Sequence, residues 1–126
     1  MTEARQELGR HGEDLVAHRL AAAGWRIVAR NCRVKAVRGE IDLIAMDGDA
    51  LVVVEVKTMR EGAMRGPETP AAMVGYRKQR KLRVLGISWL RENTVPPHRR
   101  VRFDVVAVVL DGTDRVTKWD HLEAAF

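Results

Sequence analysis

Two carboxylates and a lysine interrupt apolar segments near the middle of the chain. Asp42 lies inside the run 39–45, and Glu55 and Lys57 end the apolar run that begins at Leu51. Magnesium takes oxygen ligands and keeps several waters, so two protein carboxylates are enough to bind it. A lysine beside such a metal can orient a water molecule or stabilise charge on a phosphate. The pattern indicates metal-assisted hydrolysis of a phosphodiester.

The spacing also predicts how these side chains meet. The Asp-Gly pair at 47–48 favours a hairpin with a two-residue loop. With this pair in the turn, Asp42 is opposite Val53 and diagonal to Glu55. Side chains alternate along a strand, so Asp42, Glu55 and Lys57 share one face. A three-residue loop would place Asp42 on the other face, so the site requires an even loop length.

Further ligands are available near this pair. The backbone carbonyl of Val56 suits a hard cation. Glu13 lies among small and apolar residues of an expected helix over Glu3–Ala23, from which it could reach the site directly or through water. Glu40 falls on the face of the site and is expected to support the ligands rather than bind the metal.

An ion-pair network is the competing interpretation of Glu55 and Lys57, because the spacing of the motif is short and common. Asp104 interrupts the apolar run Val101–Leu110 and is expected to pair with Arg102 or a helix residue. The four histidines show no zinc-binding spacing with the single cysteine. The sequence contains no P-loop, nucleophile elbow or dinucleotide fingerprint.

Net charge and the pattern of apolar residues limit the classes of partner and the cellular compartment that the sequence allows. The net charge of +5 favours a polyanionic partner such as nucleic acid. No apolar run approaches the ~20 residues of a membrane helix, and a single cysteine fits a reducing compartment, so a cytoplasmic protein is expected. The side chains expected to contact phosphate lie in a loop over 58–70 and in the helix that follows: Arg60, Arg65, Arg77, Lys78 and Lys81.

The elements that position these residues alternate between helices and strands. The expected helices cover Glu3–Ala23 and Ala71–Asn93, and the expected strands cover Trp25–Arg33, Gly39–Ala45, Leu51–Lys57, Val101–Leu110 and Val116–Leu122. A buried strand, a helix and another buried strand imply a parallel crossover. The chain of 126 residues therefore predicts one domain with a mixed sheet and helices on its faces.

Several blocks resemble the YraN family of bacterial proteins. The matching blocks include Gly12-Glu13, Asn31–Arg33, Gly39–Ile44, Val54–Thr58, Arg102–Val106 and His121–Phe126. They span nearly the whole chain in order, and the Gly-Glu-Ile-Asp-Leu-Ile and Val-Glu-Val-Lys blocks together are specific. That family is similar to the PD-(D/E)xK nuclease superfamily and, within it, to archaeal Holliday junction resolvases.

The resemblance implies a three-layer α/β/α domain over residues 1–126, with a mixed central sheet and a restriction-endonuclease-like core in the order αβββαββ. It implies that Asp42, Glu55 and Lys57 match the catalytic signature and that Glu13 matches the helix glutamate of resolvase-like members. It also implies Mg²⁺ or Mn²⁺ as cofactor, DNA as substrate and a homodimer.

We therefore expect a metal-dependent endonuclease that hydrolyses phosphodiester bonds in DNA, including branched, Holliday-junction-like DNA. The sequence leaves two alternatives open. One is a non-catalytic nucleic-acid-binding protein that keeps the nuclease fold and the metal site. The other is a protein-interaction module in which the charged residues form only an ion-pair network.

Overall fold

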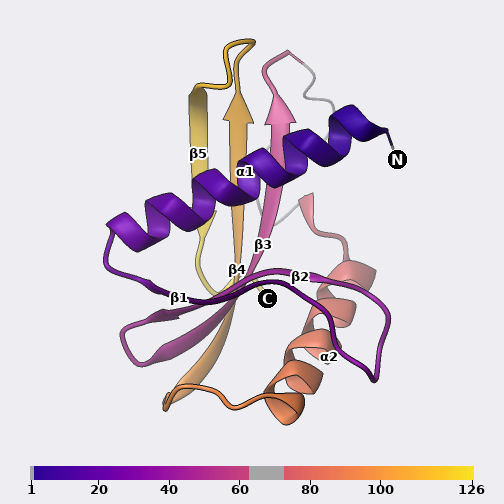
Figure 1. The fold of residues 1–126 in the computed structure, drawn as a ribbon, viewed down its shortest axis with the longest axis vertical. Helices are drawn as coiled ribbons and strands as arrows, with labels where there is room; N and C mark the ends of the chain where they lie inside the picture. Colours follow the sequence, from indigo (N-terminus) through magenta and orange to yellow (C-terminus); the bar gives the residue numbers. More distant parts are fainter. Residues whose placement is uncertain (1, 63–72) are drawn as a thin grey trace.

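The computed structural model describes residues 2–62 and 73–126 as two helices and five strands (Figure 1). The elements are α1 (Glu3–Ala22), β1 (Arg26–Cys32), β2 (Ile41–Asp47), β3 (Ala50–Arg60), α2 (Tyr76–Glu92), β4 (Arg100–Leu110) and β5 (Val116–Leu122). The order αβββαββ predicted from the sequence is confirmed. Among the described residues, no helix is long and apolar enough to cross a membrane.

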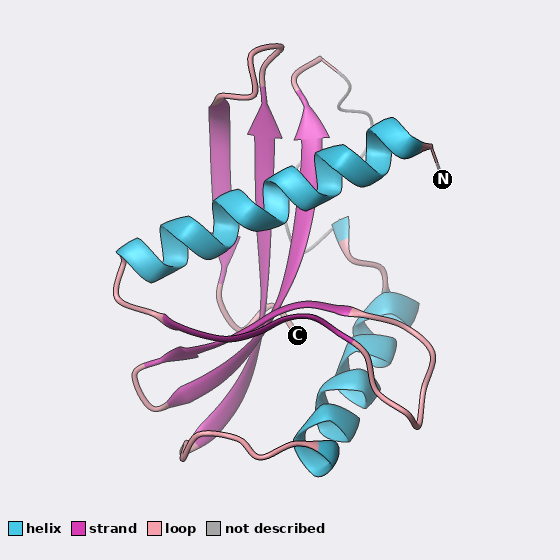
Figure 2. Cartoon of the chain, viewed as in Figure 1, coloured by secondary structure: helices cyan, strands magenta, loops and turns pink. Residues whose placement is uncertain are grey.

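The sheet has the strand order β1-β2-β3-β4-β5. Neighbouring strands are antiparallel except β3 and β4, which are parallel and are joined through α2. Figure 1 shows the twist of the sheet, with β1 and β2 running across the direction of β3 to β5. Figure 2 shows α1 lying across the sheet and α2 packed beside its lower part. The result is a mixed sheet in a three-layer α/β/α fold.

Two apolar clusters hold the helices on opposite faces of the sheet. On the α1 side the cluster includes Val16, Ala17, Leu20, Leu43, Val52, Val54, Val106 and Val108. On the α2 side it includes Leu82, Leu85, Trp89, Ile44, Leu51, Val53, Phe103 and Val105. Because β3 is covered on both faces, its residues from 50 to 56 are all buried, as expected of a central strand.

The β2–β3 turn lies one residue later than the sequence predicts. Asp47 pairs with Ala50, so Gly48 and Asp49 form the loop. Gly48 has a φ of 59°, and the first loop position of a type II′ turn takes glycine for this reason. The loop still has two residues, so the predicted parity is confirmed while the predicted register is wrong.

The corrected register brings the two central carboxylates closer together. The β2–β3 ladder includes the pairs Ile44–Val53 and Leu43–Val54. Continuing this ladder by one residue places Asp42 opposite Glu55 rather than diagonal to it. Directly opposite residues have Cβ atoms roughly 4.5–5.5 Å apart, closer than diagonal neighbours.

The end of β3 also differs from the prediction. The strand continues through Thr58 to Arg60, which the sequence assigns to a loop, because β4 pairs with it in parallel as far as Leu110. Helix α2 begins at Tyr76 rather than at residue 71. Residues 63–70 of the predicted loop, including Arg65, and the first two residues of the predicted helix lie outside the described residues.

Helix α1 approaches β3 closely at Gly12. A Cβ atom built on Gly12 would lie 1.8 Å from Oγ1 of Thr58, whereas one on Gly9 would meet nothing within 4 Å. The close neighbour of Gly12 is thus a side chain of β3. Glycine at this position sets the distance between α1 and the strand that carries Glu55.

We expect Gly12→Ala to lower the free energy of unfolding by ~1–3 kcal/mol, because the added methyl group overlaps Thr58. Gly9→Ala is the matched control, and it should raise the free energy of unfolding by up to ~1 kcal/mol through its helix propensity. Urea denaturation followed by tryptophan fluorescence measures both. Equal stability changes in the two variants would contradict a close contact at Gly12.

Candidate active site

Asp42 and Glu55 bring two carboxylates together at the end of the β2–β3 ladder. Glu55 is buried, with 3% of its surface exposed, and Asp42 is partly buried. Oδ2 of Asp42 accepts a hydrogen bond of 2.9 Å from the backbone N–H of Val56. The strand pairing and this bond fix Asp42 beside Glu55.

The electrostatics of Asp42 reflect this crowding. The pKa of Asp42 is raised to about 8, first by burial, then by the hydrogen bond and the negative charge of the adjacent Glu55, and last by the charge of Glu13. The hydrogen bond from Val56 acts in the opposite direction and does not offset these effects. Two carboxylates this close favour a positive charge between them, either a proton or a metal cation.

Two lysines from different elements meet the same oxygen of Glu55. Nζ of Lys57 on β3 lies 3.6 Å from Oε2, and Nζ of Lys78 on α2 lies 3.5 Å from it. Lys78 is predicted from the sequence to contact phosphate, but its place beside Glu55 was not foreseen. Its only sequence signal is the basic run at the start of α2, because the packing of α2 on the sheet decides which of those cations reaches the site.

Glu13 and Glu40 are joined by the side-chain amide of Asn31. The Nδ2 of Asn31 donates to Oε1 of Glu13 over 2.7 Å and to Oε1 of Glu40 over 2.9 Å. Glu40 also pairs with Arg33 over 3.2 Å. Glu40 is therefore tied to Asn31 and Arg33, and Glu13 from α1 lines the same cavity as Asp42.

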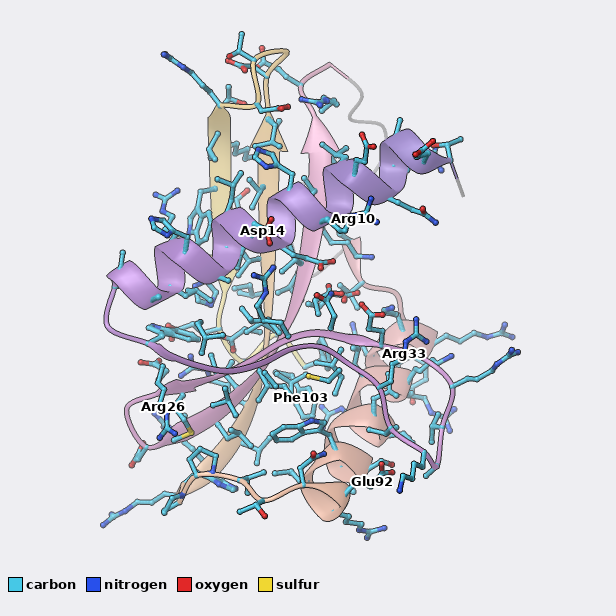
Figure 3. All side chains as sticks on the ribbon, viewed as in Figure 1. Arg10, Asp14, Arg26, Arg33, Glu92 and Phe103 are labelled. Atoms are coloured by element: carbon cyan, nitrogen blue, oxygen red, sulfur yellow. The ribbon has the colours of Figure 1, made fainter. Side chains whose placement is uncertain are left out.

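A cavity of about 590 Å³ opens beside these groups. Its lining includes Glu13, Asn31, Glu40 and Asp42, which define what we call the acidic cavity. Cations also line it: Arg5, Arg10 and Arg33. Figure 3 shows Arg10 on α1 and Arg33 after β1 at the border of a region where side-chain oxygens gather. A ligand here would meet both carboxylates and arginines.

The β1–β2 connection, which carries Arg33 and Glu40, is anchored by the end of α2. Glu92 accepts hydrogen bonds from the backbone N–H groups of Lys35, over 2.9 and 3.1 Å, and Ala36, over 3.3 Å. Figure 3 labels Glu92 on α2 near this connection. Helix α2 thus supports one wall of the acidic cavity.

The other residues predicted to bind nucleic acid have varied surroundings. Arg60 donates to the carbonyl of Asp111 over 2.8 Å and forms an ion pair with Asp114. Arg77 and Lys81 are exposed on α2. Their contact with phosphate stays a prediction, and Arg65 lies outside the described residues.

The donor chemistry fits a hard divalent cation. The candidate ligands of Asp42, Glu55 and Glu13 are carboxylate oxygens, which suit Mg²⁺ and Mn²⁺. The single thiol is a poor alternative metal ligand, because burial and the nearby Glu40 charge raise the pKa of Cys32 to about 11 and keep it protonated. By donor chemistry Asp42 and Glu55 therefore fit the expected metal, with the carbonyl of Val56 as an additional candidate ligand. Among the residues that the structure describes, the ligand atoms of Glu13, Asp42 and Glu55 do not all lie within 4.8 Å of one another, so Glu13 would act through water or after a side-chain movement.

A second cluster of potential ligands is a structural network. Asp104, His121 and Glu123 carry ligand atoms within 4.8 Å of one another. However, Arg102 donates to both oxygens of Asp104, over 2.9 and 3.0 Å, and His121 is 2.8 Å from Oδ2. The predicted pairing of Asp104 with Arg102 is confirmed. These bonds use the carboxylate to join β4 to β5.

Stability of the metal-free protein should fall as pH rises because of Asp42. An unfolded aspartate ionises near 3.8 and the folded one near 8, so the folded state binds the extra proton between these values. We expect the free energy of unfolding to decrease from pH 5 to pH 8 by at least ~1.4 kcal/mol, the value of one pKa unit. Asp42→Asn should remove this part of the slope in urea titrations with EDTA. An unchanged slope would show that Asp42 ionises normally.

The fold and the site together define a three-layer α/β/α domain with a carboxylate–lysine cluster at a β2–β3 hairpin. The chain belongs to the family described as Uncharacterised protein family UPF0102, the YraN family, whose model matches residues 12–108. Among UPF0102 proteins, that of Rhodococcus opacus is 48% identical over 94% of this chain and 95% of the relative. The Streptomyces griseus protein is 50% identical over 85% and 86%, and the Anaeromyxobacter dehalogenans protein 43% over 98% and 87%.

Proposed function

We propose that this protein is a divalent-metal-dependent endonuclease that hydrolyses phosphodiester bonds in DNA, including branched DNA. The observation that carries the proposal is the meeting of two carboxylates and an ammonium group. The β2–β3 ladder, continued by one residue, places Asp42 opposite Glu55, whose carboxylate acts on the pKa of Asp42, and Nζ of Lys57 is 3.6 Å from Glu55. Carboxylates for a metal and a lysine for proton transfer are the groups that the sequence motif predicts.

The residues divide into roles by their positions. Asp42 and Glu55 would hold Mg²⁺ or Mn²⁺, with Glu13 and the carbonyl of Val56 as further ligands. When bound, the cation supplies positive charge where negative charge develops on the phosphate. Nζ of Lys57 lies 3.6 Å from Oε2 of Glu55. Once Glu55 binds the cation, the ammonium of Lys57 can orient the attacking water or stabilise the phosphate oxygens.

The surrounding charge suits a polyanionic backbone. Arg5, Arg10 and Arg33 line the acidic cavity, where each can neutralise a phosphate next to the one that is cleaved. On α2, Arg77 and Lys81 present further exposed cations. Affinity for DNA should therefore decrease steeply as salt concentration rises. A homodimer would carry two such sites, which could act on one branched substrate. Sedimentation analysis tests whether the protein is a dimer in solution.

A cleavage assay tests the proposed function. Wild-type protein is incubated with duplex, single-stranded and four-way DNA in Mg²⁺ or Mn²⁺, with EDTA as control. Metal-dependent strand breaks are the expected result. Salt-dependent DNA binding without any strand breaks would support the non-catalytic alternative, and the absence of both would contradict both proposals.

A further inference from the structure

Asn31 has an unusual backbone conformation for a residue inside a strand. It is the penultimate residue of β1, is exposed, and has a φ of 50°. This left-handed conformation costs a non-glycine residue of order 1 kcal/mol, although asparagine tolerates it better than most. No core packing requires asparagine at this exposed position, so the side-chain contacts must explain it.

Those contacts join two segments of the acidic cavity. One nitrogen, Nδ2, lies 2.7 Å from Oε1 of Glu13 on α1 and 2.9 Å from Oε1 of Glu40 before β2. Because the amide carries no charge, it can bridge two carboxylates without adding a cation that would compete with the metal. Glu13 also raises the pKa of Asp42, which places its charge within reach of the central pair.

We propose that Asn31 is a positioning residue that holds Glu13 toward the metal at Asp42. Its left-handed backbone directs the amide between Glu13 and Glu40, and the hydrogen bond leaves the second oxygen of Glu13 for the cation. Asn31 itself does not bind the metal. The inference rests on the proposed metal site. It adds Asn31 as the residue that orients Glu13, the candidate ligand on α1.

Calorimetric titration with Mn²⁺ tests this role. Asn31→Gly removes the amide while retaining the backbone conformation, because glycine adopts positive φ readily. Metal affinity should fall about 10–100-fold, as for other residues that orient metal ligands, while the melting temperature does not fall. Ala124→Gly is the matched control, since Ala124 also has a left-handed backbone, with φ 51°, and is not among the residues that line the acidic cavity.

A double-mutant cycle separates positioning from general destabilisation. In a Glu13→Gln background, Asn31→Gly should have no further effect on Mn²⁺ affinity, because the ligand it positions is gone. The same loss in both backgrounds, or wild-type affinity in Asn31→Gly, would overturn the inference while leaving the proposed function intact. Wild-type protein that binds no Mn²⁺ would overturn both.

Discussion

Lys57→Met is expected to slow metal-dependent DNA cleavage about 10²–10⁴-fold, the usual contribution of a positioned acid–base group. The methionine retains most of the apolar stem of the lysine but removes the ammonium that lies 3.6 Å from Glu55. Because this ammonium competes with a metal for Glu55, Mn²⁺ affinity should stay the same or increase. Single-turnover cleavage and calorimetry measure the two quantities separately.

Lys118→Met provides a matched control for this prediction. Lys118 lies two residues from a carboxylate on a strand, 3.5 Å from Asp120, just as Lys57 lies two residues from Glu55. Its replacement on β5 should leave cleavage within about twofold of wild type, because β5 carries none of the proposed ligands. If Lys57→Met cleaves at the wild-type rate, the ammonium has no part in the reaction.

Asp104→Asn is expected to produce the largest loss of stability, ~3–5 kcal/mol, the typical effect of breaking a buried ion pair. Asp104 is fully buried and accepts hydrogen bonds from Arg102, His121 and the backbone of Ala124. An asparagine has nearly the same shape, but its NH₂ group is a hydrogen-bond donor. It would face other donors at the position where one oxygen of Asp104 accepts hydrogen bonds. Urea denaturation measures the loss in free energy of unfolding.

The pH dependence of this network has the opposite sign to that of Asp42. Burial opposes ionisation of Asp104, but hydrogen bonds from His121 and Arg102 outweigh it and lower its pKa below 3.8. The stabilisation by ionised Asp104 is therefore complete above the ordinary aspartate pKa and is lost only in strong acid.

Asp120→Asn is the control for Asp104→Asn. It lies at a half-exposed site on β5 and should change the free energy of unfolding by less than ~0.5 kcal/mol. A similarly small effect of Asp104→Asn would show that the network contributes little.

The local pattern of the sequence was enough to predict the layers and the shared face of the hairpin. Alternating or continuous apolar runs mark the five strands, and the crossover through α2 requires the parallel pair β3–β4. The turn was misplaced by one residue because Asp47-Gly48 and Gly48-Asp49 are both good turn pairs. Only the pairing of the flanking strands selects between them.

The missed features depend on contacts between distant segments. Asn31 follows no spacing rule relative to Glu13 and Glu40, which come from other elements. In the sequence, Lys78 cannot be distinguished from the other cations of the basic run. Only the packing of α2 on the sheet places it at Glu55. The extension of β3 to Arg60 depends on the partner strand β4. Such contacts are set by tertiary packing, so composition and periodicity do not reveal them.

Mn²⁺ titration of wild-type and Glu55→Gln protein tests the metal site most directly. Glu55→Gln retains the shape of the buried side chain but removes the charge opposite Asp42. Glu7→Gln on the exposed side of α1 is the control for loss of a carboxylate. We expect saturable binding in wild type and in Glu7→Gln, and at least a tenfold loss of affinity in Glu55→Gln. Equal affinity in all three proteins, or no binding to wild type, would contradict the proposed metal site.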